Sequence, residues 1–272
     1  MTTVSAICSC KNRQKPLSIS LSSWVLNKKI DEIIIIDWSS DEPIGHLAKI
    51  DERVKIVRVN NQQYFNQQMP LNLALFMASG EKILKMDSDY IMSPYYDFFD
   101  LYDIDSTSFV CGEPEDEGVK WNDYFLPLRG LMFCTKDNLN AVGGYNESLS
   151  NYYGFDDSEI EMRLCNSGLR KIKLKQDYSL IHIPHSDKER YENFKGTQEV
   201  ISQIEHVISY VQNGGHGYSE EKEKRWQIQR LIAENSVMNN KKAVHKDVTK
   251  IENKTRWNIK KVDKQLYEAS IA

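Results

Sequence analysis

Lys82-Ile83-Leu84-Lys85-Met86-Asp87-Ser88-Asp89 is the stretch that decides how this chain folds. A mostly apolar run, typical of a buried strand, ends in two aspartates one residue apart. In an extended chain Ser88 points the opposite way from its neighbours, so both carboxylates face the same side. Two carboxylates at a strand end supply hard oxygen ligands for a divalent cation, and bound phosphates supply others. Aspartate pairs also occur in turns and helix caps, so the interpretation depends on other segments.

The first half of the chain alternates between strand and helix patterns. The predicted strands are Val4–Cys8, Glu32–Ile36, Val54–Val59 and Lys82–Met86, and the predicted helices are Pro16–Leu26 and Pro70–Ala78. Continuous apolar runs such as Ile33-Ile34-Ile35-Ile36 are typical of parallel strands covered on both faces. The pattern therefore predicts an α/β sheet with helices on both faces. Ligands of such sheets bind beyond the carboxyl ends of the strands, where Arg13, Asp37 and Asp87 fall.

The second half is mixed and ends in a basic segment. Predicted strands cover 109–112, 131–134, 172–174 and 179–183, and predicted helices cover 137–141, 157–167 and 191–211. Residues 219–272 carry a net charge of +5 against −9 for the rest of the chain. Val248, Ile259 and Leu266 fit one face of a helix. We therefore expect a catalytic domain over 1–213 and a basic helical C-terminal extension over 214–272.

Composition sets broad limits on location and partners. A net charge of −4 argues against general nucleic-acid binding. The five cysteines show no framework spacing, so buried free thiols are expected. With no signal peptide and no apolar run long enough to span a bilayer, we expect a soluble, cytoplasmic protein.

An acidic segment follows two aromatic residues near the middle of the chain. Tyr153-Gly154-Phe155 precedes Asp156 and Asp157, and two glutamates follow within one helical turn. Acids favour the amino end of a helix, and capping is one interpretation. Capping needs only one or two acids, however. Aromatic faces beside carboxylates are typical of a sugar site, and a carboxylate there can take a proton from an attacking hydroxyl.

Two histidines end the strand predicted at 179–183. His182 and His185 lie three residues apart, which makes them better metal candidates than isolated histidines. A mixed set of histidine and aspartate ligands suits Mn²⁺. After the first strand, the cation of Arg13 is placed to meet a diphosphate or to stabilise a loop. Asp37 is placed to accept a hydrogen bond from a base or ribose, with turn chemistry as the rival interpretation.

Together these segments resemble glycosyltransferases of the GT-A fold, over roughly residues 3–196. The resemblance is strongest to the β-1,4-galactosyltransferases. Polypeptide N-acetylgalactosaminyltransferases and chondroitin polymerases of family 2 are also similar, through the spacing from Gly143-Gly144-Tyr145 to Arg163. The matching segments are Asn12-Arg13-Gln14, Phe65-Asn66 with Leu71-Asn72, Asp87-Ser88-Asp89, Asp156-Asp157 with Ile160, and His182-x-x-His185-Ser186.

The resemblance implies a Rossmann-like nucleotide-binding sheet and a role for each matching residue. It makes Asp157 the catalytic base and places Asp156, Tyr153 and Phe155 at the acceptor. Metal ligands would be Asp89, His185 and His182, holding Mn²⁺ or Mg²⁺. The nucleotide would be held by Lys11, Arg13, Asp37, Asn72 and Asp87. The family's mobile Trp-Gly-Gly stretch is shortened here to Tyr153-Gly154-Phe155. On a loose alignment, Leu128 replaces a tyrosine that crowds the sugar in galactosyltransferases, which would leave room for an N-acetyl group.

The expected activity is metal-dependent, inverting transfer from a UDP-sugar to a hydroxyl of a glycan, glycoprotein or glycolipid. Galactose and N-acetylgalactosamine are favoured, with glucose as a further option. The alternatives are a sugar nucleotidyltransferase, which would need a Gly-rich loop absent from Ser5–Cys10, and a non-catalytic binding protein of the same fold. For the C-terminal extension, packing within the protein or in a homodimer competes with contact to an acidic membrane surface.

Overall fold

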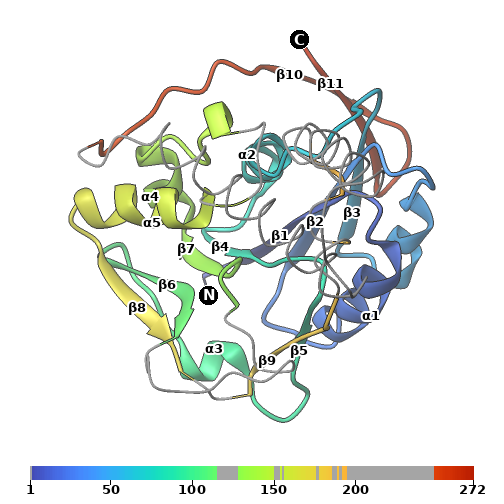
Figure 1. The fold of residues 1–272 in the computed structure, drawn as a ribbon. Helices are drawn as coiled ribbons and strands as arrows, with labels where there is room; N and C mark the ends of the chain where they lie inside the picture. The colour runs from blue at the N-terminus through green and yellow to red at the C-terminus, as the bar shows by residue number, and fades with distance from the viewer. Residues whose placement is uncertain are drawn as a thin grey trace, which may run out of the picture.

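The structure, a computed structural model, describes residues 2–114, 128–149, 154, 156–175, 178–185, 189, 192–194 and 248–272. Across these residues, nine strands form one mixed sheet in the order β10-β11-β3-β2-β1-β4-β7-β6-β8 (Figure 1). Its strands are β1 (Val4–Cys10), β2 (Glu32–Trp38), β3 (Val54–Val59), β4 (Lys82–Lys85), β6 (Ser108–Pro114), β7 (Met132–Thr135), β8 (Arg170–Leu174), β10 (Trp257–Lys261) and β11 (Leu266–Ile271). A separate two-stranded sheet pairs β5 (Tyr90–Met92) with β9 (Leu180–His182).

The four central strands are parallel, as the sequence predicts. β1 pairs with both β2 and β4, and β2 pairs with β3, all in parallel. All seven residues of β2 are buried, because helices cover both of its faces. Parallel strands end at the same edge of a sheet, so the residues that follow β1, β2 and β4 are gathered there.

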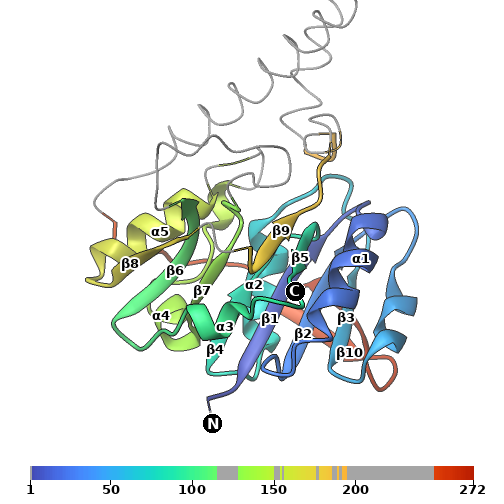
Figure 2. The same ribbon diagram turned by 90° about the horizontal axis from the view of Figure 1, so that it is seen from below.

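Helices cover the two faces of the sheet in two separate layers (Figures 1 and 2). On one face lie α1 (Gln14–Trp24) and α3 (Phe98–Leu101). On the other face lie α2 (Gln68–Met77), α4 (Lys136–Ala141) and α5 (Asp156–Asn166). Alternate residues of β1 and β2 divide accordingly: Cys8 packs with the α1 layer and Ile7 with the α2 layer. Two short 3₁₀ helices, η1 (Gly45–Ile50) and η2 (Glu147–Leu149), complete the connections.

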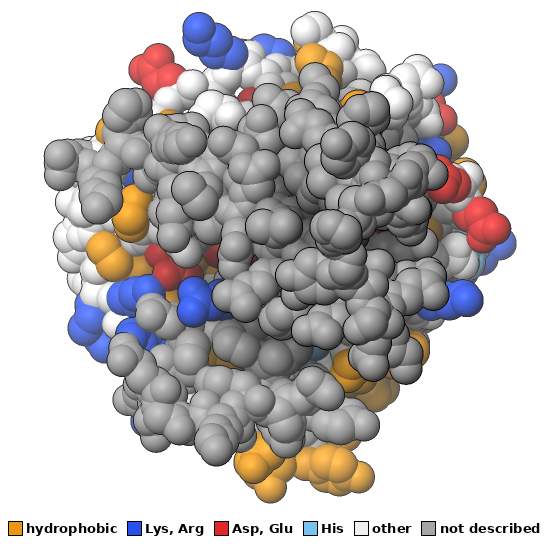
Figure 3. All heavy atoms as spheres, viewed as in Figure 1, with side chains coloured by type: hydrophobic (Ala, Val, Ile, Leu, Met, Phe, Trp, Pro, Cys, Tyr) orange, Lys and Arg blue, Asp and Glu red, His pale blue; other side chains and the backbone are white. Residues whose placement is uncertain are grey.

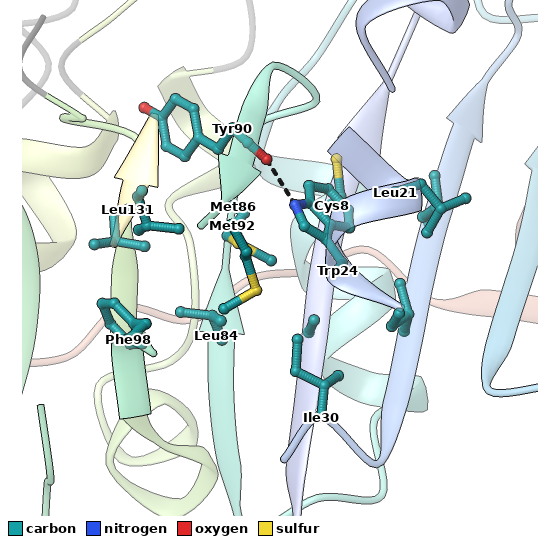
Figure 4. Packing of buried hydrophobic residues seen from close by; sticks show 14 of the residues in the cluster. Cys8, Leu21, Trp24, Ile30, Leu84, Met86, Tyr90, Met92, Phe98 and Leu131 are labelled. Atoms are coloured by element: carbon teal, nitrogen blue, oxygen red, sulfur yellow. Dashed lines mark hydrogen bonds between the residues drawn. The ribbon is translucent and has the colours of Figure 1, made fainter. Parts of the chain in front are cut away.

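Trp24 joins the α1 layer to the strand that follows the paired aspartates (Figure 4). Its indole is fully buried, and its Nε1 donates a hydrogen bond of 2.6 Å to the backbone oxygen of Tyr90. The side chains of Leu84, Met86 and Met92 pack in the same cluster. The path of the chain immediately after Asp89 is therefore fixed from the core.

The C-terminal segment differs from the prediction, because residues 257–271 form strands rather than a helix. β10 and β11 form an antiparallel hairpin, and β11 extends the main sheet by pairing in parallel with β3. Trp257 and Ile259 alternate with polar residues, which is a strand pattern. The rest of the predicted helical extension, up to residue 247, lies outside the described residues, and so does nearly all of the helix predicted at 191–211. The boundary at 213/214 stays a prediction.

The segment before β10 crosses the α2 face of the molecule as an extended strap (Figure 1). Asn253 anchors it: Nδ2 donates to the backbone oxygens of Gly143 and Tyr145, both at 2.8 Å, and Oδ1 accepts from Glu147 N. The strap thus ties the region before α5 to the far edge of the sheet.

The surface shows a charged sheet edge and an exposed aromatic turn. Lys and Arg side chains gather over the edge strand β8 (Figure 3), where Arg170 and Lys175 are exposed. Charged edge strands resist pairing with other chains. Hydrophobic side chains are exposed at the lower rim in Figure 3, where the turn after β5 carries Tyr95 and Tyr96. Among the described residues, no helix combines the length and apolar character needed to cross a membrane.

Candidate active site

The edge where β1, β2 and β4 end gathers most of the residues predicted for the site. Arg13 lies at the start of α1, three residues after β1, and Asp37 is paired in register with Cys10. Asp87 and Asp89 follow β4 after Met86, in a turn rather than in the extended chain expected, so their carboxylates contact different groups. The expectation that these segments meet at one edge is confirmed.

Asp89, His182 and His185 form a compact cluster at this edge. The Oδ2 atom of Asp89 lies 3.3 Å from Nε2 of His185 and 3.8 Å from Nε2 of His182. One donor atom from each residue lies within 4.8 Å of the other two. Asp89 and His182 are buried and His185 is half-buried, so the three donor atoms are shielded from bulk water.

The small sheet of β5 and β9 brings these distant residues together. Tyr90 pairs with His182 in this sheet, and the backbone nitrogen of Ile183 donates to the backbone oxygen of Asp89 at 2.8 Å. Because Trp24 anchors the same Tyr90 from the core, both the aspartate and the histidine are attached to one rigid element. The paired aspartates and the histidine segment therefore form a single site although more than 90 residues separate them.

The cluster fits a divalent cation. Metal–ligand bonds near 2.1 Å place neighbouring donor atoms about 3 to 3.5 Å apart, close to the separations seen here. Two imidazole nitrogens and one carboxylate oxygen form a mixed donor set of the kind that binds divalent transition-metal ions. Arg13 also contacts this site, since its Nη2 lies 2.7 Å from the same Oδ2 of Asp89. The guanidinium of Arg13 therefore lies against the same carboxylate oxygen that faces both imidazoles.

A second cluster surrounds the buried side chain of Lys85. Its Nζ lies 2.9 Å from Oδ1 of Asp87 and 3.1 Å from Oδ1 of Asp157. Burial alone would lower the pKa of Lys85, but Asp157 and Asp87 outweigh it and raise that pKa well above its usual value. Burial would raise the pKa of Asp87, yet Lys85 holds it below the usual range. Lys85 is therefore a permanent cation between the two carboxylates.

Asp156 and Asp157 lie in the first turn of α5 but differ in exposure. The side chain of Asp157 is 21% exposed, whereas Asp156 is buried. Burial raises the pKa of Asp157 well above its usual value, with Lys85 opposing and Asp156 adding to the effect. Burial also raises the pKa of Asp156. A partly exposed carboxylate with increased proton affinity is suited to accept a proton from a bound molecule.

A buried ion pair within α5 attaches the helix that carries these acids to the backbone of Val142. Arg163 contacts Glu159 through two hydrogen bonds of 2.8 and 2.6 Å and donates to the backbone oxygen of Val142 at 2.7 Å. These groups are fully engaged inside the protein. Glu159 and Arg163 therefore hold α5 in place, whereas Asp157 contacts Lys85 and Asp156 acts on the same ammonium electrostatically.

Comparison with known proteins identifies the family. Residues 5–155, more than half of the chain, match the family described as Glycosyl transferase family 2. The chain belongs to this family. It is a glycosyltransferase, and its sheet has the GT-A fold. No curated protein matches the chain in sequence.

Solved structures share the fold of this glycosyltransferase. The mannosyltransferase PcManGT from Pyrobaculum calidifontis, in complex with GDP-Man and Mn²⁺, is similar with a TM-score of 0.53 and 15% identity, over 85% of this chain and 69% of that one. TarS of S. aureus, residues 1–349, is similar with a TM-score of 0.50 and 16% identity, over 73% of this chain and 64% of that one. At these identities the likeness concerns the fold alone.

Three residues predicted to hold the nucleotide form hydrogen bonds within the glycosyltransferase itself. Lys11 Nζ donates to the backbone oxygens of Trp38, Ser39 and Gln62. Asp37 accepts from Arg58 at 2.7 Å and from the backbone nitrogens of Ser40 and Ile44. Asn72 bonds to the backbone of Tyr145 through both its oxygen and its nitrogen, and also to Glu147. These bonds shape the loops at the edge, and direct contact with a nucleotide stays a prediction for all three.

Some residues of the site were not singled out from the sequence, and others cannot be placed. Lys85 carried a visible signal, because a lysine inside an apolar strand needs a buried partner. Gly130 and Tyr90 carried none. The backbone nitrogen of Gly130 donates to the hydroxyl of Tyr90 at 3.0 Å, and a Cβ on Gly130 would lie 1.9 Å from Oδ2 of Asp87. Tyr153 and Phe155, predicted at the acceptor, lie outside the described residues.

Proposed function

We propose that this glycosyltransferase transfers a hexose or N-acetylhexosamine from a UDP-sugar to a hydroxyl of a glycan or glycoconjugate, with inversion and with a divalent cation. The observation that carries the proposal is that two clusters lie at one sheet edge: Asp89, His182 and His185, whose donor atoms are closely spaced, and Asp157 beside Lys85. Lys85 lies about 3 Å from both Asp157 and Asp87, and Asp87 precedes Asp89 by two residues in the chain.

On the donor side, the chain's residues would hold the nucleotide diphosphate and compensate its charge. Asp89, His182 and His185 would ligate the cation. A bound Mn²⁺ or Mg²⁺ would neutralise the charge that develops on the leaving diphosphate. Arg13, whose Nη2 lies 2.7 Å from Oδ2 of Asp89, would contact a phosphate bound beside that carboxylate. The nearby carboxylate of Asp87 would accept a hydrogen bond from the ribose.

On the acceptor side, Asp157 would act as general base. As the acceptor oxygen attacks the anomeric carbon from the face opposite the diphosphate, its proton passes to Asp157. The bond from the anomeric carbon to the diphosphate oxygen breaks, and the configuration inverts. A base of this kind contributes about 10²- to 10⁴-fold in rate. The exposure of Asp157, greater than that of Asp156, favours it for this role.

The donor sugar is proposed from the sequence resemblance to galactosyltransferases, which favours galactose or N-acetylgalactosamine over glucose. Leu128 supports an N-acetylated donor on the alignment described above. The mannosyltransferase PcManGT was solved with GDP-Man, so a donor panel should include guanosine donors as well as UDP-sugars. The acceptor is proposed only as a hydroxyl of a glycan, glycoprotein or glycolipid.

A nucleotide-release assay across this donor panel tests the proposal. We expect metal-dependent release of UDP that increases with a glycan acceptor, and loss of about 10²- to 10⁴-fold in kcat for Asp157→Asn with UDP and metal still bound. Glu161→Gln is the matched control, because Glu161 lies on the same helix but pairs with Lys171. Wild-type turnover by Asp157→Asn would refute the mechanism. Release of pyrophosphate from a nucleoside triphosphate would indicate a nucleotidyltransferase, and binding without release a non-catalytic protein.

A further inference from the structure

Lys85 is a buried cation that contacts both halves of the proposed site. Its side chain is 1% exposed and projects from the end of β4. The ammonium nitrogen lies 2.9 Å from Asp87, on the donor side, and 3.1 Å from Asp157, on the acceptor side. Burying a charged lysine is costly unless it is paired. A single ammonium shared between two carboxylates from different elements is therefore a specific arrangement.

The groups around Lys85 are mainly acids. Asp87 faces it from the turn between β4 and β5, and Asp156 and Asp157 face it from α5. The hydroxyls of Tyr145 and Tyr90 and the thiol of Cys8 also approach this region. Arg163, the nearby buried cation of α5, is bonded to Glu159 and to a backbone oxygen. Among the residues that the structure describes, Lys85 is therefore the cation that contacts Asp87 and Asp157 and offsets the repulsion among the three aspartates.

We propose that Lys85 is a positioning residue that orients Asp157 toward the acceptor and links it to Asp87. This inference rests on the function proposed above, because it assigns Lys85 a task only if Asp157 accepts a proton. The ammonium fixes one carboxylate oxygen of Asp157, which leaves the other oxygen to meet the acceptor hydroxyl.

Removing the ammonium has a consequence that a merely structural residue would not show. Burial, Asp156 and Asp87 all raise the pKa of Asp157, whereas Lys85 lowers it. Without Lys85 the pKa of Asp157 rises further, so the protonated, inactive form persists to higher pH. The acid limb of kcat should therefore move toward higher pH. A scaffold defect alone would lower kcat by the same factor at every pH.

The first experiment compares the pH profiles of kcat for the wild type, Lys85→Met and Lys85→Arg. We expect Lys85→Met to lose about 10²-fold at pH 7 and to regain part of that loss at higher pH. Lys85→Arg keeps the charge and should restore the wild-type acid limb. Lys171→Met is the control, because Lys171 lies on β8 and its ammonium pairs with Glu161 of the same helix at 2.6 Å. An unchanged profile for Lys85→Met, or an equal loss at all pH values without rescue by arginine, would overturn the inference.

A second measurement does not require turnover, so it separates this inference from the proposed function. The carboxyl ¹³C resonance of Asp157, assigned with Asp157→Asn, is followed by NMR as a function of pH in the metal-free protein. Asp157 should titrate at higher pH in Lys85→Met than in the wild type. If Lys85→Met does not fold, Lys85→Gln removes the charge and keeps a hydrogen-bond donor. Identical titration in the wild type and the uncharged variant would refute the role of Lys85, whether or not the enzyme transfers sugar.

Discussion

Gly130 offers a sharp test of the site geometry, because it is the residue against which Asp87 packs. A Cβ placed on Gly130 would lie 1.9 Å from Oδ2 and 2.4 Å from Cγ of Asp87. Real Cβ contacts are essentially never closer than 3.0 Å. In Gly130→Ala the two groups must therefore separate by roughly 1 Å or more, and Asp87 cannot keep its 2.9 Å contact with Lys85 unchanged.

Gly130→Ala is expected to reduce the catalytic rate more severely than it reduces the free energy of unfolding. Crowding of this kind destabilises a protein by about 1 to 3 kcal/mol. A displacement of about 1 Å at a reacting centre costs on the order of 10²-fold in rate. We therefore expect Gly130→Ala to remain folded, to bind UDP with Mn²⁺ more weakly, and to lose about 10²-fold in kcat/KM.

Gly45→Ala is the matched control. A Cβ on Gly45 would meet only the two terminal methyl groups of Leu266, at 3.5 and 4.0 Å, which is ordinary contact, and the φ of Gly45 is not in the left-handed region. Calorimetry with UDP and Mn²⁺, nucleotide-release kinetics and urea unfolding are measured for both variants. If Gly130→Ala binds and turns over like Gly45→Ala, the placement of Asp87 against Gly130 is wrong.

Two further predictions concern the supports of the metal site. Trp24→Phe removes the hydrogen bond to the backbone oxygen of Tyr90 and leaves a small cavity. Urea unfolding should therefore show that the free energy of unfolding falls by about 2 to 4 kcal/mol. A decrease below about 1 kcal/mol would contradict the anchoring of β5 by Trp24. Arg13→Ala removes a cation that competes for the Oδ2 atom of Asp89, so calorimetry without nucleotide should show Mn²⁺ binding about fivefold tighter, and weaker binding would contradict that competition.

The sequence was sufficient for the central sheet because its signals are local. The apolar run of β2 needs burial on both faces, and only a parallel sheet covered by two helix layers provides that. The aspartates that follow β4 were predicted at the carboxyl edge for the same reason, and the structure places them there. The match of residues 5–155 to Glycosyl transferase family 2 confirms the family that these segments indicate, while the specific resemblance to galactosyltransferases stays a prediction.

Contacts between distant segments were harder to predict. The pairing of Tyr90 with His182 depends on a three-residue strand too short to leave a clear pattern. The hydrogen bonds that Lys11 and Asp37 form with backbone groups depend on loop conformations that composition does not encode. The C-terminal hairpin was predicted as helix because its few apolar residues fit both periods, and its pairing with β3, some 200 residues earlier, has no local signal.

Binding of Mn²⁺ is the most direct test of the central claim, which is that Asp89, His182 and His185 hold a divalent cation at the sheet edge. Calorimetry or electron paramagnetic resonance is used with the wild type, Asp89→Ala, His185→Ala and the control His46→Ala, with and without UDP. His46 contacts Gln14 and lies outside the cluster. We expect one Mn²⁺ per chain in the wild type and the control, and at least tenfold weaker binding in the other two variants. Equal affinity in all four proteins, or no binding by the wild type even with UDP, would contradict the account.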